Sequence, residues 1–208
     1  MYWGNITASV DWCETNYENS KYIVEYFNTI SSLSMVICGV YGYYMTQRNL
    51  LLYTSILLVG IGSIMFHATL LWQFQALDEV PMIYTCLIII YMSSTFISKK
   101  ILIPLLFLYG LVATYLVVGK ENKYQFVLFH TCYGIPHGII MVYLVIVYKS
   151  TRNVVVRLRL QEIFGWFALG VMCWFLDLLF CETFKAFQLH AWWHFFISIT
   201  IYKFSRLL

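Results

Sequence analysis

Charged residues are scarce in this 208-residue chain. Asp, Glu, Lys and Arg together make up 11% of it, whereas hydrophobic residues make up 61%. Water-soluble domains carry about a quarter charged residues, so the composition excludes an ordinary soluble enzyme and indicates a protein that crosses a membrane several times. The net charge of +3 is small and spread along the chain, so we expect no nucleic-acid partner.

The chain also lacks the local patterns of several other protein classes. Its six cysteines are scattered without a CxxC pair, which excludes a zinc finger or a dense disulfide framework. Residues 1–27 are polar, aromatic and acidic, unlike the basic and then apolar start of a cleavable signal peptide. No linker or internal repeat divides the remainder. We therefore expect an acidic amino-terminal segment, residues 1–27, followed by one transmembrane domain, residues 28–208.

Long apolar segments fill most of residues 28–208. A helix needs roughly 20 apolar residues to cross a bilayer, and short polar breaks separate seven segments of about that length. The sequence therefore predicts an all-α membrane protein with a bundle of seven transmembrane helices. The predicted spans are Asn28–Met45, Leu50–Trp72, Glu79–Ser98, Ile101–Val118, Tyr124–Tyr148, Gln161–Cys181 and Phe187–Phe204.

The basic residues favour one orientation of this bundle. Seven spans place the amino terminus and the second, fourth and sixth loops on one side, and basic residues concentrate on the cytoplasmic side of a membrane. We therefore expect a lumenal or external amino terminus and a cytoplasmic carboxyl terminus. The first side carries Lys21, Lys120, Lys123 and Lys185, and the other carries Arg48, Lys99, Lys100, Lys149, Arg152, Arg157, Arg159, Lys203 and Arg206.

Polar residues gather near the predicted lumenal ends of three spans. His67 lies near the end of the second span, with Ser63 one turn before it, and Asp78 precedes the third. In "HAWWH", His190 and His194 share one face at the start of the seventh span. Three imidazoles suit Zn²⁺, and a site with three protein ligands keeps a position for water. The pattern predicts a three-histidine zinc site.

A histidine in a membrane helix can instead serve only as a hydrogen-bonding group between helices. We place His130 and His137, which flank Pro136 within the fifth span, in that class. The same alternative remains open for each of the other three histidines.

Longer stretches of the sequence resemble the alkaline ceramidase family. They are "WGNITASVDWCETNYENSKYIVEYFNTISSLSM", "GIGSIMFHATLLWQFQALDEVPMIY", "CWFLDLLFCE" and "LHAWWH". The resemblance runs through most of the chain, and its first, second and last stretches are specific in combination. It implies a seven-helix intramembrane amidase that hydrolyses ceramide to sphingosine and a fatty acid, uses Zn²⁺ and is regulated by Ca²⁺. Its partners would be ceramide and membrane lipid, with no obligate protein partner evident.

The resemblance also assigns roles to individual residues. His67, His190 and His194 resemble the family's zinc ligands, and Ser63 and Asp78 resemble its catalytic polar pair. For amide hydrolysis, we expect Asp78 to orient or deprotonate the attacking water and then pass a proton to the leaving amine. We expect Ser63 to donate a hydrogen bond to the oxyanion.

The acidic amino-terminal segment resembles the family's calcium site. Ca²⁺ takes about six to eight oxygen ligands, and this short segment offers several. Neither the spacing nor the turn glycine of an EF-hand is present. Without the resemblance, the same residues would suit a solvated acidic arm. The implied ligands are the side chains of Asp11, Glu14, Asn16 and Glu25 and the carbonyl of Trp12.

Two cysteines fall on the predicted lumenal side. Cys13 lies in the amino-terminal segment and Cys181 closes the sixth span, whereas the other four lie inside spans. An oxidising lumen would favour a disulfide between them. The alternative is two buried free thiols.

Other functions fit parts of this pattern. A receptor of the progestin or adiponectin type would also be a seven-helix protein with a three-histidine zinc site, and the basic fifth loop could bind a signalling partner. The block "DWCETNY" favours the ceramidase. A retinal-type receptor needs a lysine in the middle of the seventh span, whereas Lys203 lies at its end. An inactive homologue is a third alternative. For the ceramidase, we expect the endoplasmic reticulum or the Golgi.

Overall fold

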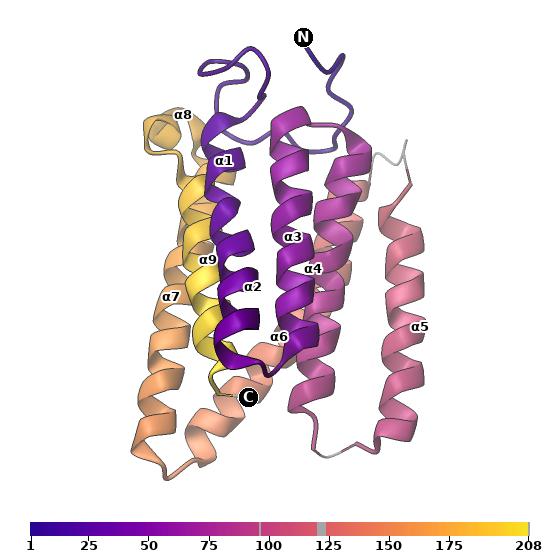
Figure 1. Cartoon of the computed structure of the whole chain (residues 1–208), viewed down its shortest axis with the longest axis vertical. Coiled ribbons are helices and arrows are strands. Elements are labelled where there is room, and N and C mark those ends of the chain that lie inside the picture. The colour runs from indigo at the N-terminus through magenta and orange to yellow at the C-terminus, as the bar shows by residue number, and fades with distance from the viewer. Residues whose placement is uncertain (96, 120–123, 208) are drawn as a thin grey trace.

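The computed structural model describes residues 1–95, 97–119 and 124–207. Every regular element in these ranges is a helix (Figure 1). Lys120 and Lys123, two of the residues behind the predicted orientation, lie outside the described residues. The helices are α1 (Tyr26–Ser31), α2 (Leu33–Thr46), α3 (Leu50–Thr69), α4 (Trp72–Ser93), α5 (Lys99–Val117), α6 (Gln125–Ser150), α7 (Val154–Leu179), α8 (Cys181–Phe184), the 3₁₀ helix η1 (Lys185–Phe187) and α9 (Leu189–Ser205).

The helices indicate a membrane protein. Five of them, α3 to α7, are long and apolar enough to cross a bilayer. The predicted first span is divided at Ser32 into α1 and α2, and the predicted seventh span corresponds to α9, which has 17 residues. The all-α prediction is confirmed for the described residues, while the count of seven spans stays a prediction.

Several predicted boundaries are wrong. The third span was expected from Glu79 to Ser98, but α4 begins at Trp72 and ends at Ser93. The letters "QFQALD" (residues 73–78) therefore form helix and not loop, because Gln75, Ala76 and Asp78 are buried and Gln75 hydrogen-bonds to Ser9 of the amino-terminal segment. Helix α7 likewise begins at Val154, where Asn153 caps it by accepting hydrogen bonds from Val155 N and Val156 N. The division of the chain after residue 27, a position within α1, stays a prediction.

The amino-terminal segment lies across one end of the bundle (Figure 1). The last carbonyls of a helix have no partner within it, and here the segment supplies donors to the end of α3. Glu25 N donates to His67 O at 3.0 Å, and Val24 N donates to Ala68 O at 3.1 Å. Thr7 N and Ala8 N both donate to Leu70 O. The segment therefore fixes the end of α3 on which His67 lies.

Close approach between α3 and α4 depends on a glycine. A Cβ built on Gly62 would lie 2.2 Å from Leu77 O and 2.8 Å from Asp78 N. Only the missing side chain lets the backbones of the two helices meet at this depth. The contact places Ser63 of α3 and Asp78 of α4 at the same level of the bundle.

Candidate metal centre and its cavity

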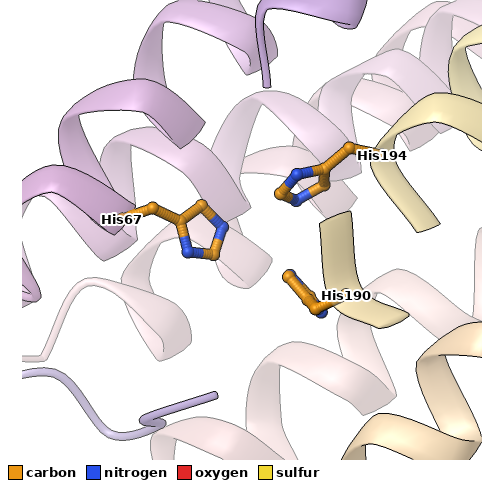
Figure 2. Close-up of side chains that lie close together, drawn as sticks. All are labelled: His67, His190 and His194. Atoms are coloured by element: carbon orange, nitrogen blue, oxygen red, sulfur yellow. The ribbon is translucent and has the colours of Figure 1, made fainter. Parts of the chain in front are cut away.

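Three histidine side chains meet near the end of the bundle that carries the amino-terminal segment. His67 comes from the last turn of α3, and His190 and His194 come from the first two turns of α9. Figure 2 shows the three rings pointing toward one another. Each ring offers one nitrogen, and these atoms lie within 4.8 Å of one another in a buried group. Such a group could hold a metal ion.

Hydrogen bonds at Nδ1 orient two of the three rings. His67 Nδ1 lies 2.5 Å from Glu25 Oε2. His194 Nδ1 lies 2.8 Å from Ser31 Oγ and 3.4 Å from Ser32 Oγ. Partners at Nδ1 leave Nε2 free to face a metal, as is usual for ligating histidines.

His190 is held by different contacts. Trp12 stacks on the His190 ring, with the ring centroids 3.7 Å apart. The backbone N–H of His190 donates to Asp177 Oδ1 at 3.2 Å. Its Nδ1 is buried and has no hydrogen-bond partner in the described part of the chain. Buried polar atoms are nearly always paired, so this nitrogen has the environment expected when a ligand completes the site. The donor set therefore fits a metal.

An apolar cavity of about 350 Å³ adjoins this centre. Ser63, Asp78, His190 and His194 line it, and most of its wall is aliphatic or aromatic. The lining extends along α9 from His190 to Phe204, about 20 Å at 1.5 Å per residue. The cavity therefore joins a polar end at the histidines to a long apolar interior.

Asp78 and Ser63 differ in how their polar atoms are used. Asp78 Oδ1 is buried without a hydrogen-bond partner among the described residues. Ser63 Oγ lies 2.9 Å from Ser32 Oγ, which itself donates to Asn28 O at 2.7 Å. Because Ser32 has one proton and gives it to Asn28, Ser63 is the donor in the serine pair. An unpaired carboxylate oxygen and a hydroxyl group thus face the same cavity as the histidines.

The predicted calcium ligands lie close together but have different partners. Asn16 Nδ2 donates to both carboxylate oxygens of Asp11, at 3.2 and 2.9 Å. Trp12 N donates to Glu25 Oε1 at 2.9 Å. Glu14 accepts from the backbone nitrogens of Phe27 and Asn28, at 2.7 and 3.0 Å, at the start of α1.

These carboxyl groups crowd one another, and no lysine or arginine pairs with them in the part of the chain that the structure describes, where Glu25 contacts the imidazole of His67. Burial raises the pKa of Glu25 well above its usual range, and nearby Asp11 raises it further. Burial also raises the pKa of Glu14, and nearby Glu25 raises it further. A bound cation would favour the ionised form of each carboxyl group.

Cys13 and Cys181 form a disulfide with Cα atoms 5.3 Å apart. The adjacent Asp177 Oδ2 accepts a hydrogen bond from Cys13 N at 3.2 Å, while its Oδ1 holds His190. Asp177 thereby connects the amino-terminal segment, α7 and α9 through hydrogen bonds. The amino-terminal segment is thus bonded beside the helix that carries two of the histidines.

Sequence reasoning missed the groups that orient the histidines. Ser31 and Ser32 lie inside the predicted first span, and the resemblance implies only a calcium role for Glu25. The available signal was the polar run "FNTISS", from Phe27 to Ser32, at the start of an apolar segment. Polar groups inside a membrane are costly and mark functional positions. His130 and His137 line the cavity without joining the metal-binding group.

Comparison with known proteins identifies the family. Alkaline ceramidase 3 of Mus musculus is 31% identical over 235 residues, covering 97% of this chain and 82% of that protein. Alkaline ceramidase of Arabidopsis thaliana is 30% identical over 217 residues, covering 97% and 82%. The Dictyostelium discoideum protein dcd3A is 33% identical over 262 residues, covering 99% and 87%. The ceramidase family profile matches residues 4–208, and the chain therefore belongs to the ceramidase family of hydrolases.

Proposed function

We propose that this protein is a zinc-dependent intramembrane ceramidase that hydrolyses the amide bond of ceramide to sphingosine and a free fatty acid. The observation that carries the proposal is one apolar cavity whose polar end combines His190, His194, Ser63 and Asp78. The alternative of a progestin- or adiponectin-type receptor gains no observation in its favour.

The metal proposed for the three histidines is Zn²⁺. Imidazole nitrogen is a preferred zinc ligand, and three protein ligands leave a position for water or substrate. Bound zinc would supply a more acidic water and polarise the amide carbonyl. Glu25 and Ser31 would keep the rings of His67 and His194 in the ligating orientation.

Asp78 and Ser63 divide the proton and charge chemistry in this proposal. Asp78 Oδ1 has no competing partner among the described residues, so it can accept a proton from the attacking water and transfer it to the leaving amine nitrogen. Ser63 would turn its proton from Ser32 Oγ to the carbonyl oxygen as negative charge develops there. The apolar cavity interior would hold a hydrocarbon chain of the lipid.

Calcium would bind beside this centre. The proposed ligands are Asp11, Glu14, Asn16, Glu25 and the carbonyl of Trp12. The crowded carboxylates support it, and Asn16 Oδ1 is buried without a hydrogen-bond partner in the described residues. Because Glu25 also contacts His67, calcium at these ligands would influence the orientation of a proposed zinc ligand.

The membrane arrangement belongs to the same proposal. If α1 and α2 cross the bilayer as one broken segment and α9 also crosses it, the chain has seven spans. The two termini lie at opposite ends of the bundle (Figure 1), as an odd number requires. With the basic residues on the cytoplasmic side, the metal centre faces the lumen of the endoplasmic reticulum or Golgi. Ceramide and membrane lipid are the proposed partners.

The test is to purify the protein in detergent, measure its metal content and follow fatty-acid release from ceramide. His194→Ala is expected to lose bound zinc and activity together, because it removes one of three ligands. His137→Ala is the matched control, since this histidine lines the same cavity outside the metal-binding group. Its zinc content is expected to be unchanged. Unaltered zinc and turnover in His194→Ala would contradict the assigned centre.

A further inference from the structure

Glu79 is a second buried carboxylate on the wall of the cavity. It follows Asp78 directly in α4, lines the same cavity and is 5% exposed. The proposed hydrolysis assigns no role to it. A charged group is costly to bury without a partner, so its surroundings indicate what it binds.

Neutral amide groups hold Glu79 in place. Gln75 Nε2 donates to Glu79 Oε1 at 2.7 Å, and Gln125 Nε2 donates to Oε2 at 3.3 Å. The orientation of the Gln75 amide is fixed, because its Oε1 accepts a hydrogen bond from Ser9 N at 2.7 Å. Glu79 is therefore an acceptor at both oxygens.

No basic side chain pairs with Glu79 among the described residues. Two neutral donors leave each oxygen with a further lone pair and leave the charge uncompensated. A hydrogen-bond donor or a cation that enters through the cavity would occupy these lone pairs. Helix α4 thus presents consecutive carboxylates, of which Asp78 has an unpaired oxygen and Glu79 is fixed by α4 and α6.

We propose that Glu79 binds the polar head of the sphingoid base, the amine side of the bond that is cleaved. This inference rests on the proposed ceramidase function. In the substrate, the hydroxyl groups beside the amide nitrogen donate to Glu79. After hydrolysis, the new amine takes up the proton that the released fatty acid loses, and its ammonium group pairs with the same carboxylate. Glu79 is then a substrate-binding residue that selects amino alcohols, while Asp78 carries the proton transfer.

The experiment compares ceramide with two analogues, one lacking the C1 hydroxyl and one lacking the C3 hydroxyl. A hydrogen bond to a charged group contributes about 10- to 100-fold to an equilibrium constant. Wild-type kcat/KM is therefore expected to fall by about that factor for at least one analogue. In Glu79→Gln, kcat/KM for the same analogue is expected to lie much closer to kcat/KM for ceramide, because the charged acceptor is absent. A group with a purely structural role would lower the rates for all three substrates equally.

Thr85→Val is the matched control. Thr85 lines the cavity six residues further along α4, and its hydroxyl group is occupied by Pro81 O at 2.8 Å. This change is expected to preserve the ratio between ceramide and each analogue. As a product assay, inhibition by sphingosine is expected to weaken in Glu79→Gln, while inhibition by fatty acid is unchanged.

The outcomes separate the two proposals. Absence of fatty-acid release from ceramide by metal-loaded wild-type protein contradicts the proposed function. If both proteins hydrolyse ceramide, and the ratio of kcat/KM between ceramide and each analogue is the same in wild type and Glu79→Gln, the assignment of Glu79 is overturned and the proposed function stands. If Glu79→Gln does not fold, Glu79→Asp keeps the charge on a shorter side chain and is measured in the same way. Unchanged discrimination in that variant also overturns the assignment.

Discussion

At the scale of single residues, contacts separate histidines that the sequence presents alike. His130 Nδ1 is occupied by Phe126 O of its own helix at 2.6 Å, and the ring of His137 stacks on Phe167. His67 and His194 instead have partners at Nδ1 on other parts of the chain. Two of the three proposed metal ligands, His67 and His194, are therefore distinguished from His130 and His137 by partners at Nδ1 from distant parts of the chain.

Asp78→Asn is expected to remain folded and metal-loaded while its kcat falls about 10²- to 10⁴-fold, the range for loss of a general acid–base group. The amide has nearly the same shape but cannot accept a proton from water. Turnover and zinc content of the purified variant check this. Glu162→Gln is a control for loss of a carboxylate charge, because Glu162 is exposed on α7 and pairs with Lys203. Wild-type turnover in Asp78→Asn would remove Asp78 from the mechanism.

Glu25→Ala is expected to blunt the calcium response and also to weaken zinc binding about 10- to 100-fold, as loss of a group that orients a metal ligand commonly does. Glu25 contacts both His67 and the backbone of Trp12. Asp11→Asn is the matched variant, since the contacts of Asp11 lie within the acidic segment. It should lose the calcium response and retain zinc. Calcium titrations of activity with parallel zinc measurements distinguish the two, and an equal calcium response in both variants and wild type would contradict the site.

At the scale of elements, backbone contacts set the position of the proposed catalytic groups. Helix α3 ends where backbone N–H groups of the amino-terminal segment occupy its final carbonyls, and α4 begins after two intervening residues. Because α4 starts at Trp72, Asp78 lies in its second turn and faces the cavity. A start at Glu79 would have left Asp78 in a loop.

Gly62→Ala is expected to lower the free energy of unfolding by about 1–3 kcal/mol, the usual cost of overpacking a filled interior, and to reduce activity further by moving Asp78. The added methyl group would collide with Leu77 O, a backbone atom that cannot rotate away. Gly165→Ala is the control, since no atom of the described residues lies within 4 Å of its Cβ position. Thermal unfolding and kcat of both variants test this. Equal stability and activity in both would show that α3 and α4 can separate at no cost.

At the scale of the whole molecule, one covalent bond and the amino-terminal segment connect the two ends of the chain. Cys13 and Cys181 are separated by 168 residues. Closing so long a loop restricts the unfolded chain by about 5 kcal/mol in the entropy model, an upper value when a membrane already restricts it. The bond keeps the proposed calcium ligands beside α9.

Peptide mass spectrometry without reductant is expected to recover Cys13 and Cys181 as one linked pair, with Cys38, Cys86, Cys132 and Cys173 alkylated after unfolding. Cys13→Ser and Cys181→Ser should lower the unfolding temperature to the same extent, because each removes the same bond. Recovery of both cysteines as free thiols from protein isolated without reductant would contradict the bond and the lumenal placement of this end.

The sequence by itself determined the all-α character, the membrane class and the family. Apolar length and charge scarcity are properties of composition, and the stretches around His67 and "LHAWWH" are local. The histidine set could also be inferred, since a spacing of four places His190 and His194 on one helical face. These features need no knowledge of which segments meet.

Only the tertiary structure decided what surrounds those residues. Glu25 reaches His67 across 42 positions and Ser31 reaches His194 across 163, and no local pattern encodes such pairs. The helical state of "QFQALD" was also hidden, because Gln75 and Asp78 are polar residues that a local pattern assigns to solvent, whereas the structure buries both and pairs Gln75 with Ser9. A buried polar residue needs a partner within the protein, whereas an exposed one bonds to water. Which of the two applies is set by the packing of distant segments.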